Sequence, residues 1–251
     1  MIGADEIIDM RNIRVKIAYV GTAYHGFQRQ NNSMAVQNVI ECALSKLCNE
    51  PVVINGCSRT DAGVHANEYY FSFTTHSRIP CKNIVSGLNS FLPSDISAYQ
   101  AEEMPEDFHA RYSCKGKEYL YIIENSQAAS PFLYARCWHY PYPLDITSMK
   151  DQAKCLCGTH DFSAFCGSAG IKDDNTRTVN YINIGKNDDI ISIYICGDGF
   201  LYNMVRIIVG TLAEHNGEDI LVTERILQSR DRNTAGITAP AGGLYLNKVM
   251  Y

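Results

Sequence analysis

The stretch Val52-Val-Ile-Asn-Gly-Cys-Ser-Arg-Thr-Asp-Ala-Gly-Val-His-Ala-Asn-Glu-Tyr-Tyr-Phe-Ser-Phe-Thr74 contains two apolar runs separated by a loop with two glycines. The runs Val52–Asn55 and Glu68–Thr74 are rich in β-branched and aromatic residues, which favour strands. The loop at 56–66, called the Asp61 loop below, places a basic, a hydroxyl and an acidic residue in succession at Arg59-Thr-Asp61. A sheet often holds catalytic groups on such loops, so this loop is a candidate site.

Two interpretations of Asp61 are open from the loop alone. In the first, the small residues Ala62 and Gly63 let a ligand approach the carboxylate closely, and the loop is catalytic. In the second, Asp61 caps a turn and Arg59 forms a salt bridge nearby.

Hydrophobic periodicity predicts the other elements. Ile13–Tyr19 alternates apolar and polar residues, as a half-buried strand does. Apolar residues from Val36 to Leu47 recur with the period of a helix, which we expect Ser33 to cap and Pro51 to stop. Further strands are expected from Ile96 and at Lys115–Glu124, Thr178–Ile184, Ile190–Cys196 and Leu244–Val249, and further helices around Ile84–Leu88, from Ile146 to Gly158, and at Tyr202–Glu214 and Asp219–Ser229.

Both halves of the chain combine strands and helices in this way. We therefore predict an α+β protein of two similar subdomains, with mostly antiparallel sheets flanked by helices and an active-site cleft between them. The N-terminal subdomain covers 10–125 and carries the Asp61 loop, and the C-terminal subdomain covers 144–251. The segment 126–143, which holds three of the eight prolines, connects them.

The composition limits the possible functions. A chain of 251 residues with 46% hydrophobic residues can bury a sizeable core. Its net charge is −5, from 22 basic and 27 acidic residues, and it has no basic tail. Any contact with nucleic acid must therefore come from a local basic cleft.

Targeting signals and common nucleotide-binding or hydrolytic motifs are missing from the sequence. The apolar segment Leu201–Ala213 is shorter than the roughly 20 residues that span a membrane. Met1–Asp9 is acidic and unlike a secretory signal, so we expect a cytoplasmic protein whose ten cysteines are reduced. The patterns G-x-x-x-x-G-K-[ST], G-x-G-x-x-G, G-x-S-x-G and H-E-x-x-H are absent, which argues against nucleotide triphosphatases, dinucleotide oxidoreductases, α/β-hydrolases and zincins.

Seven segments, in order, resemble the TruA-type tRNA pseudouridine synthases, which isomerise uridines in the anticodon arm. The segments are Lys16-Ile-Ala-Tyr-Val-Gly-Thr-Ala-Tyr-His-Gly-Phe-Gln-Arg-Gln30, Ser58-Arg-Thr-Asp-Ala-Gly-Val-His-Ala66, Phe108-His-Ala-Arg-Tyr112, Lys117-Glu-Tyr-Leu-Tyr121, Gly158-Thr-His-Asp-Phe-Ser-Ala-Phe165, Asp198-Gly-Phe-Leu-Tyr-Asn-Met-Val-Arg206 and Thr238-Ala-Pro-Ala-Gly-Gly-Leu-Tyr-Leu246. The resemblance covers nearly the whole chain from Asn12. It implies an enzyme without a cofactor that converts uridine to pseudouridine at position 38, 39 and/or 40 of tRNA, and a homodimer whose subunits build the RNA cleft together.

The resemblance implies three catalytic residues. Asp61 is the catalytic aspartate, Tyr119 stacks on the flipped base and moves the C5 proton, and Arg206 lies beside the aspartate. Asp61 could attack the sugar or the ring, or withdraw the sugar 2′ proton, and all three alternatives require an ionised carboxylate. Tyr119 could instead pack within the sheet, as we expect for Tyr121. Arg206 lies in an apolar helical run, where an unpaired charge would be costly, which independently favours an ion pair.

The resemblance also implies contacts with RNA. Arg59 matches the residue that takes the place of the flipped base, although a phosphate contact or a structural role is the alternative. The other matching residues are Phe108, His109, Ala110, Arg111 and Tyr112, and Arg177 within Asn175–Thr178. A solvated or salt-bridged surface is the alternative for this second group.

No metal site is expected. Cys155, Cys157, His160 and Cys166 include no C-x-x-C pair, and the first two lie two residues apart at a helix end, where side chains diverge. Two other functions are considered. An RNA-binding protein that has lost catalysis would lack one of the three catalytic residues, and an aspartate-dependent hydrolase would need a second carboxylate, for which Glu68 on the next strand is the nearest in sequence.

The sequence departs from the family pattern at two places. Ser58 stands where many members carry glycine, and we expect this change only to modify the conformation of the loop. The leader Met1–Asp9 precedes the point at which the family usually begins, and we assign it no function.

Overall fold

The computed structural model describes residues 10–251, so the leader at 1–9 lies outside the described residues. Within residues 10–251, ten strands form one sheet with the order β4-β1-β3-β10-β5-β9-β8-β7, while β2 pairs with β3 and β6 with β5. The strands are β1 (Arg11–Tyr19), β2 (Asn55–Gly56), β3 (His65–Thr75), β4 (Ile96–Met104), β5 (Gly116–Glu124), β6 (Trp138–His139), β7 (Gly158–Asp161), β8 (Thr176–Asn187), β9 (Ile190–Gly197) and β10 (Leu244–Met250). The α-helices are α1 (Val36–Cys48), α2 (Cys81–Phe91), α3 (Ile146–Ala153), α4 (Met204–Glu214) and α5 (Val222–Ser229).

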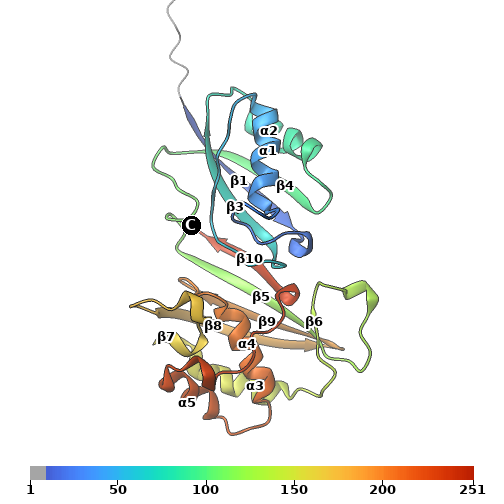
Figure 1. Cartoon of the computed structure of the whole chain (residues 1–251), viewed down its shortest axis with the longest axis vertical. Helices are drawn as coiled ribbons and strands as arrows, with labels where there is room; N and C mark the ends of the chain where they lie inside the picture. Colours follow the sequence, from blue (N-terminus) through green and yellow to red (C-terminus); the bar gives the residue numbers. More distant parts are fainter. Residues whose placement is uncertain (1–9) are drawn as a thin grey trace, which may run out of the picture.

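The C-terminal strand joins the two halves of the molecule. Strand β10 runs parallel to β3, with Leu246 beside Ala66, and antiparallel to β5, with Leu246 beside Tyr119. Figure 1 shows β1, β3 and β4 with α1 and α2 at one end, β7 to β9 with α3 to α5 at the other, and β10 and β5 crossing between them. The end of the Asp61 loop therefore lies two strands away from Tyr119.

The predicted fold class is confirmed. Most strand pairs are antiparallel, and the helices pack against the sheet in both halves. The core contains Ile13 and Val15 of β1, Ile40 of α1 and Ile208 of α4, all fully buried, and burial of each such side chain contributes about 1.5–3 kcal/mol. The division into 10–125, 126–143 and 144–251 stays a prediction, because one sheet runs through both halves.

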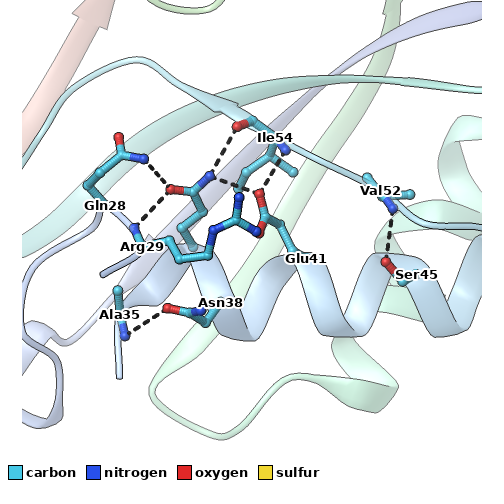
Figure 2. Close-up of polar contacts among 9 residues, drawn as sticks. Gln28, Arg29, Ala35, Asn38, Glu41, Ser45, Val52 and Ile54 are labelled. Atoms are coloured by element: carbon cyan, nitrogen blue, oxygen red, sulfur yellow. Dashed lines mark hydrogen bonds and ion pairs between the residues drawn. The ribbon is translucent and has the colours of Figure 1, made fainter. Parts of the chain in front are cut away.

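The predicted strand at Val52–Asn55 is wrong for most of its length. Only Asn55 and Gly56 pair with the sheet, as β2. Side chains of α1 bind the backbone before them: Ser45 Oγ accepts from the Val52 N–H at 3.0 Å, and Glu41 Oε1 accepts from the Ile54 N–H at 3.1 Å (Figure 2). These side chains satisfy the backbone groups that a neighbouring strand would otherwise bind.

Two predicted helix ends also differ. Helix α1 begins at Val36 rather than near Ser33, and the Asn38 side chain accepts from the N–H of the preceding Ala35 at 3.3 Å (Figure 2). Helix α3 ends at Ala153, well before the predicted end at Gly158. Gly158 has a φ of 109° and begins β7 instead.

A buried histidine fixes the end of the Asp61 loop. His65 Nδ1 accepts a hydrogen bond from the Gly21 N–H at 2.9 Å, so its Nε2 carries the proton. Nε2 lies 3.1 Å from both the Ala135 and the Gly242 carbonyl oxygens. One imidazole therefore connects three segments: the turn after β1 at Gly21, the connecting segment 126–143 at Ala135, and the residues that lead into β10 at Gly242.

Replacement of His65 by leucine should lower the free energy of unfolding by about 3 kcal/mol, because the buried Gly21 N–H and the part-buried carbonyls of Ala135 and Gly242 lose their partner. His139→Leu is the matched control, since its Nε2 contacts one carbonyl, that of Ser126. Urea denaturation of both variants measures the difference. Equal, small losses in the two variants would show that His65 does not hold these segments together.

Candidate active site

The Asp61 loop is held by the segment Gly21–Phe27. The Phe27 N–H donates to the Thr60 carbonyl at 3.1 Å, and Gly26, with a φ of 89°, brings its Cα so close that a Cβ would lie 2.7 Å from the same oxygen. A Cβ on Gly21 would lie 1.9 Å from the Val64 carbonyl oxygen. Only glycine fits these two positions, which explains the spacing of glycines in this segment.

Helix α1 supports this segment from the other side. At its first turn, the N–H groups of Val36 and Gln37 donate to the carbonyls of Gly26 and Phe27 at 3.2 and 3.0 Å. The buried Gln37 side chain accepts from the Arg29 N–H at 3.0 Å and donates to Glu41 at 2.8 Å (Figure 2). The N-terminal N–H groups of a helix lack intrahelical partners, so here they anchor the segment that holds the Asp61 loop.

A pocket of about 310 Å³ opens beside the Asp61 loop. Its lining comes from the Asp61 loop, from Arg111, Lys117 and Tyr119 of the first half, and from Gly170, Lys172, Arg177, Leu244 and the segment 200–205 of the second half. The predicted residues Asp61, Arg59, Tyr119, Arg111 and Arg177 therefore meet around one cavity. Arg206 contacts Asp61 without lining the pocket.

Asp61 and Arg206 form an ion pair between the two halves. Arg206 Nη1 lies 3.6 Å from Asp61 Oδ2, and both side chains are largely buried. The guanidinium is fixed by the Ala239 carbonyl, which accepts from Nε at 2.7 Å, and by Asn203 Oδ1, which accepts from Nη1 at 2.9 Å. Burial raises the pKa of Asp61, and the charge of Arg206 lowers it, with the net direction upward from the ordinary value. Arg206 thus favours the ionised carboxylate at a site that otherwise disfavours it.

Tyr119 projects from β5 into the same pocket. Its side chain is almost fully buried, and its ring meets Phe200 edge to face at 5.1 Å. Its hydroxyl lies 3.1 Å from Ser58 Oγ. Burial raises the pKa of Tyr119 well above its ordinary value, so the hydroxyl is neutral at pH 7. Tyr121 instead donates to the Pro240 carbonyl at 2.7 Å.

The residues of the Phe108–Tyr112 motif differ in their burial and contacts. The Phe108 carbonyl accepts from the Asn12 side chain at 2.8 Å, and Ala110 is fully buried. His109 Nδ1 accepts from the N–H groups of Arg111 and Tyr112 at 3.1 and 3.3 Å and so shapes the turn. The side chains of Arg111 and Tyr112 are exposed, and Arg111 reaches the pocket.

The sequence did not predict that several of the pocket residues belong to the site. Lys172 follows a short 3₁₀ turn at Ser168–Gly170, and nothing in its local sequence marks a site. Asn203 has a φ of 60° directly before α4, and its side chain binds Arg206. Asparagine before an apolar helix is a recognisable signal for such a conformation, and this signal could have identified Asn203.

Residues 10–251 contain no group of three or more His, Cys, Asp or Glu side chains placed to hold a metal ion. Cys155 Sγ donates to the Gln152 carbonyl at 3.2 Å, and His160 Nε2 lies 3.0 Å from the Cys157 carbonyl. In the same described part of the chain, no helix is long and apolar enough to cross a membrane.

Comparisons with known proteins agree on one family. The model of the family described as tRNA pseudouridine synthase matches residues 16–113 and 153–251. The tRNA pseudouridine synthase A of Thermoanaerobacter sp. (strain X514) is 49% identical over 244 residues, which cover 96% of this chain and 100% of that protein. The tRNA pseudouridine synthase A of Acetivibrio thermocellus is 47% identical over 244 residues with the same coverage, and tRNA pseudouridine synthase A 2 of Clostridium tetani is 47% identical over 248 residues, covering 96% and 99%. The chain belongs to the tRNA pseudouridine synthase family, and the predicted resemblance is confirmed.

Replacement of Arg206 by glutamine should lower the rate of pseudouridine formation about 10- to 100-fold, because the largely buried Asp61 carboxylate loses the positive charge that it is paired with. The acidic limb of the pH–rate profile should also move to higher pH. We expect Asp61 to act in its ionised form. Its raised pKa rises further without the guanidinium, so activity should be lost at a higher pH as the pH falls through that pKa.

The control is Arg225→Gln, which removes an exposed arginine paired with Asp219. This variant should keep the wild-type profile. An acidic limb that stays in place in Arg206→Gln would show that Arg206 does not control the ionisation of Asp61.

Proposed function

We propose that this chain converts uridine to pseudouridine at position 38, 39 and/or 40 of the tRNA anticodon arm, with Asp61 as the catalytic carboxylate and without a cofactor. The observation that carries the proposal is that Asp61 and Tyr119 line one pocket while Arg206 forms an ion pair with Asp61. The reaction breaks the bond between N1 and the ribose and forms a bond between C5 and the ribose. The C5 proton then leaves the ring, and N1 takes up a proton.

The positions of the three residues support the roles that we propose for them. Asp61, ionised beside Arg206, attacks the sugar or the ring, or withdraws the sugar 2′ proton. Tyr119 offers the face of its ring for stacking and its hydroxyl for movement of the C5 proton.

Base flipping is part of the proposal. A base stacked in the anticodon arm must leave the stack to reach Asp61. Arg59 supports this step, because it is exposed and lies on the Asp61 loop at the pocket lining. Its guanidinium can fill the space that the flipped base leaves.

The charges around the pocket fit a polyanion. Arg59, Arg111, Lys117, Lys172 and Arg177 line it. Among the described residues of the lining, Asp61 is the only carboxylate. An acidic protein can thus present a local cationic surface to RNA phosphates.

The two rival functions are less well supported. A glycoside hydrolase generally needs two facing carboxylates, and the described lining offers Asp61 alone. An RNA-binding protein that has lost catalysis would lack one of the three catalytic residues, and Asp61, Tyr119 and Arg206 are all present.

The proposal extends to the assembly and its location. We propose a homodimer in the cytoplasm, in which two copies build the RNA cleft together. The exposed side chains of Arg111 and Tyr112 beside the pocket support an RNA path that continues beyond one subunit. Sedimentation of the purified chain, alone and with tRNA, tests the dimer.

Asp61→Asn should reduce pseudouridine formation by at least about 10⁴-fold, because it removes the charge but keeps the shape of the side chain. The affinity for tRNA should change less than about twofold, since the cationic lining is intact. Single-turnover conversion and filter binding measure the two quantities. A variant that still converts uridine near the wild-type rate would exclude the carboxylate mechanism.

Arg111→Ala should reduce the slope of log affinity against log salt by roughly 0.7–0.9, the effect of one lost phosphate contact. The modified position should stay the same. Arg225→Ala, which removes an arginine outside the pocket lining, is the control and should keep the wild-type slope. An affinity for tRNA that does not depend on salt would show that phosphate contacts do not hold the RNA.

A further inference from the structure

The hydroxyl of Ser58 is placed to control the hydroxyl of Tyr119. The two oxygens lie 3.1 Å apart, and within residues 10–251 Ser58 is the hydrogen-bond partner of the Tyr119 side chain. The Tyr119 ring packs edge to face against Phe200, and only 7% of Tyr119 is exposed. Its hydroxyl therefore has little freedom to seek another partner.

Ser58 is itself held rigidly. The hydroxyl of Tyr69 donates to the Ser58 carbonyl, and the Ser58 N–H donates to the oxygen of that Tyr69 hydroxyl at 3.3 Å. Tyr69 is fully buried and stacks on Phe27 with 4.2 Å between ring centroids. The backbone of Ser58 is thus fixed on both sides of its Cα, so its Oγ needs only one rotation to meet Tyr119.

The next residues of the loop are fixed in the same way. The Tyr19 hydroxyl lies 2.8 Å from Thr60 Oγ1, and the Thr60 carbonyl accepts from the Phe27 N–H at 3.1 Å. The distance between Ser58 and Asp61 therefore cannot change freely. Through this loop, the Tyr119 hydroxyl and the Asp61 carboxylate keep a constant relation to each other.

A hydrogen bond between two hydroxyl groups can run in either direction. When Ser58 donates to the Tyr119 oxygen, the phenolic proton is free to point into the pocket, where the base lies. The same donation stabilises negative charge on the Tyr119 oxygen. In the opposite direction, the phenolic proton is occupied by Ser58 and faces away from the substrate.

Resting on the proposed function, we propose that Ser58 is a positioning residue of the isomerisation: its hydroxyl donates to Tyr119 and fixes the direction of the phenolic O–H toward the flipped base. Ser58 acts through Tyr119 and does not itself touch the substrate in this scheme. The expectation that Ser58 only modifies the loop conformation is thereby replaced by a role for its hydroxyl.

A double-mutant cycle on the full chain tests this role. Ser58→Ala should lower the single-turnover rate of pseudouridine formation about five- to tenfold, as one neutral hydrogen bond would. The affinity for tRNA should change less than about twofold. Ser58→Thr, which restores a hydroxyl, should recover most of the loss. In the Tyr119→Phe background, Ser58→Ala should cost less than about twofold, because the partner hydroxyl is already absent.

A serine outside the site supplies the control. This control is Ser86→Ala, because the exposed Ser86 hydroxyl on α2 donates to the Asn83 carbonyl at 3.2 Å, and it should leave the rate unchanged. Circular dichroism and urea denaturation check that each variant folds.

An equal loss from Ser58→Ala in both backgrounds would overturn the inference, because the effect would not pass through the Tyr119 hydroxyl. A wild-type rate in Ser58→Ala would overturn it as well. In either case an active wild type and an inactive Asp61→Asn would leave the proposed function standing. A wild type that forms no pseudouridine would overturn both proposals.

Discussion

The ion pair between Asp61 and Arg206 is the contact on which the site depends, because its two members come from opposite halves of the chain. Arg206 is fixed by Ala239 and Asn203 and cannot follow a displaced carboxylate. The fold must therefore bring the Asp61 loop to the arginine. Without that approach, burial alone would raise the pKa of Asp61 and favour the protonated acid.

Two parts of the fold bring the loop into place. On one side, β10 lies between β3 and β5, so that Ala66, Leu246 and Tyr119 stand in one row across the sheet. On the other side, α1 binds both the segment Gly21–Phe27 and the residues before β2 through its backbone and through buried polar side chains such as Glu41 (Figures 1 and 2). The Asp61 loop lies between these supports, and its position follows from both.

Local sequence patterns predicted the fold class and most strands and helices, because alternation and helical periodicity report which face of an element is buried. They failed at Val52–Ile54, whose backbone is bound by helix side chains, and they did not reveal that β10 inserts between β3 and β5. Both depend on contacts between residues far apart in the sequence. The same limit applies to the site. Sequence motifs predicted Asp61 and its partners, whereas Lys172 lies in no such motif and lines the pocket only because of the tertiary fold.

Tritium release from tRNA labelled at C5 of uridine is the most direct measurement of the proposed chemistry. Bonding of C5 to the ribose transfers the C5 hydrogen to water, so the purified chain should release one tritium for each uridine converted in the anticodon arm, with no free uracil. A deaminating or binding activity would release none. Release of free uracil, or full retention of tritium in tRNA that the protein binds, is incompatible with an isomerase built on Asp61, Tyr119 and Arg206.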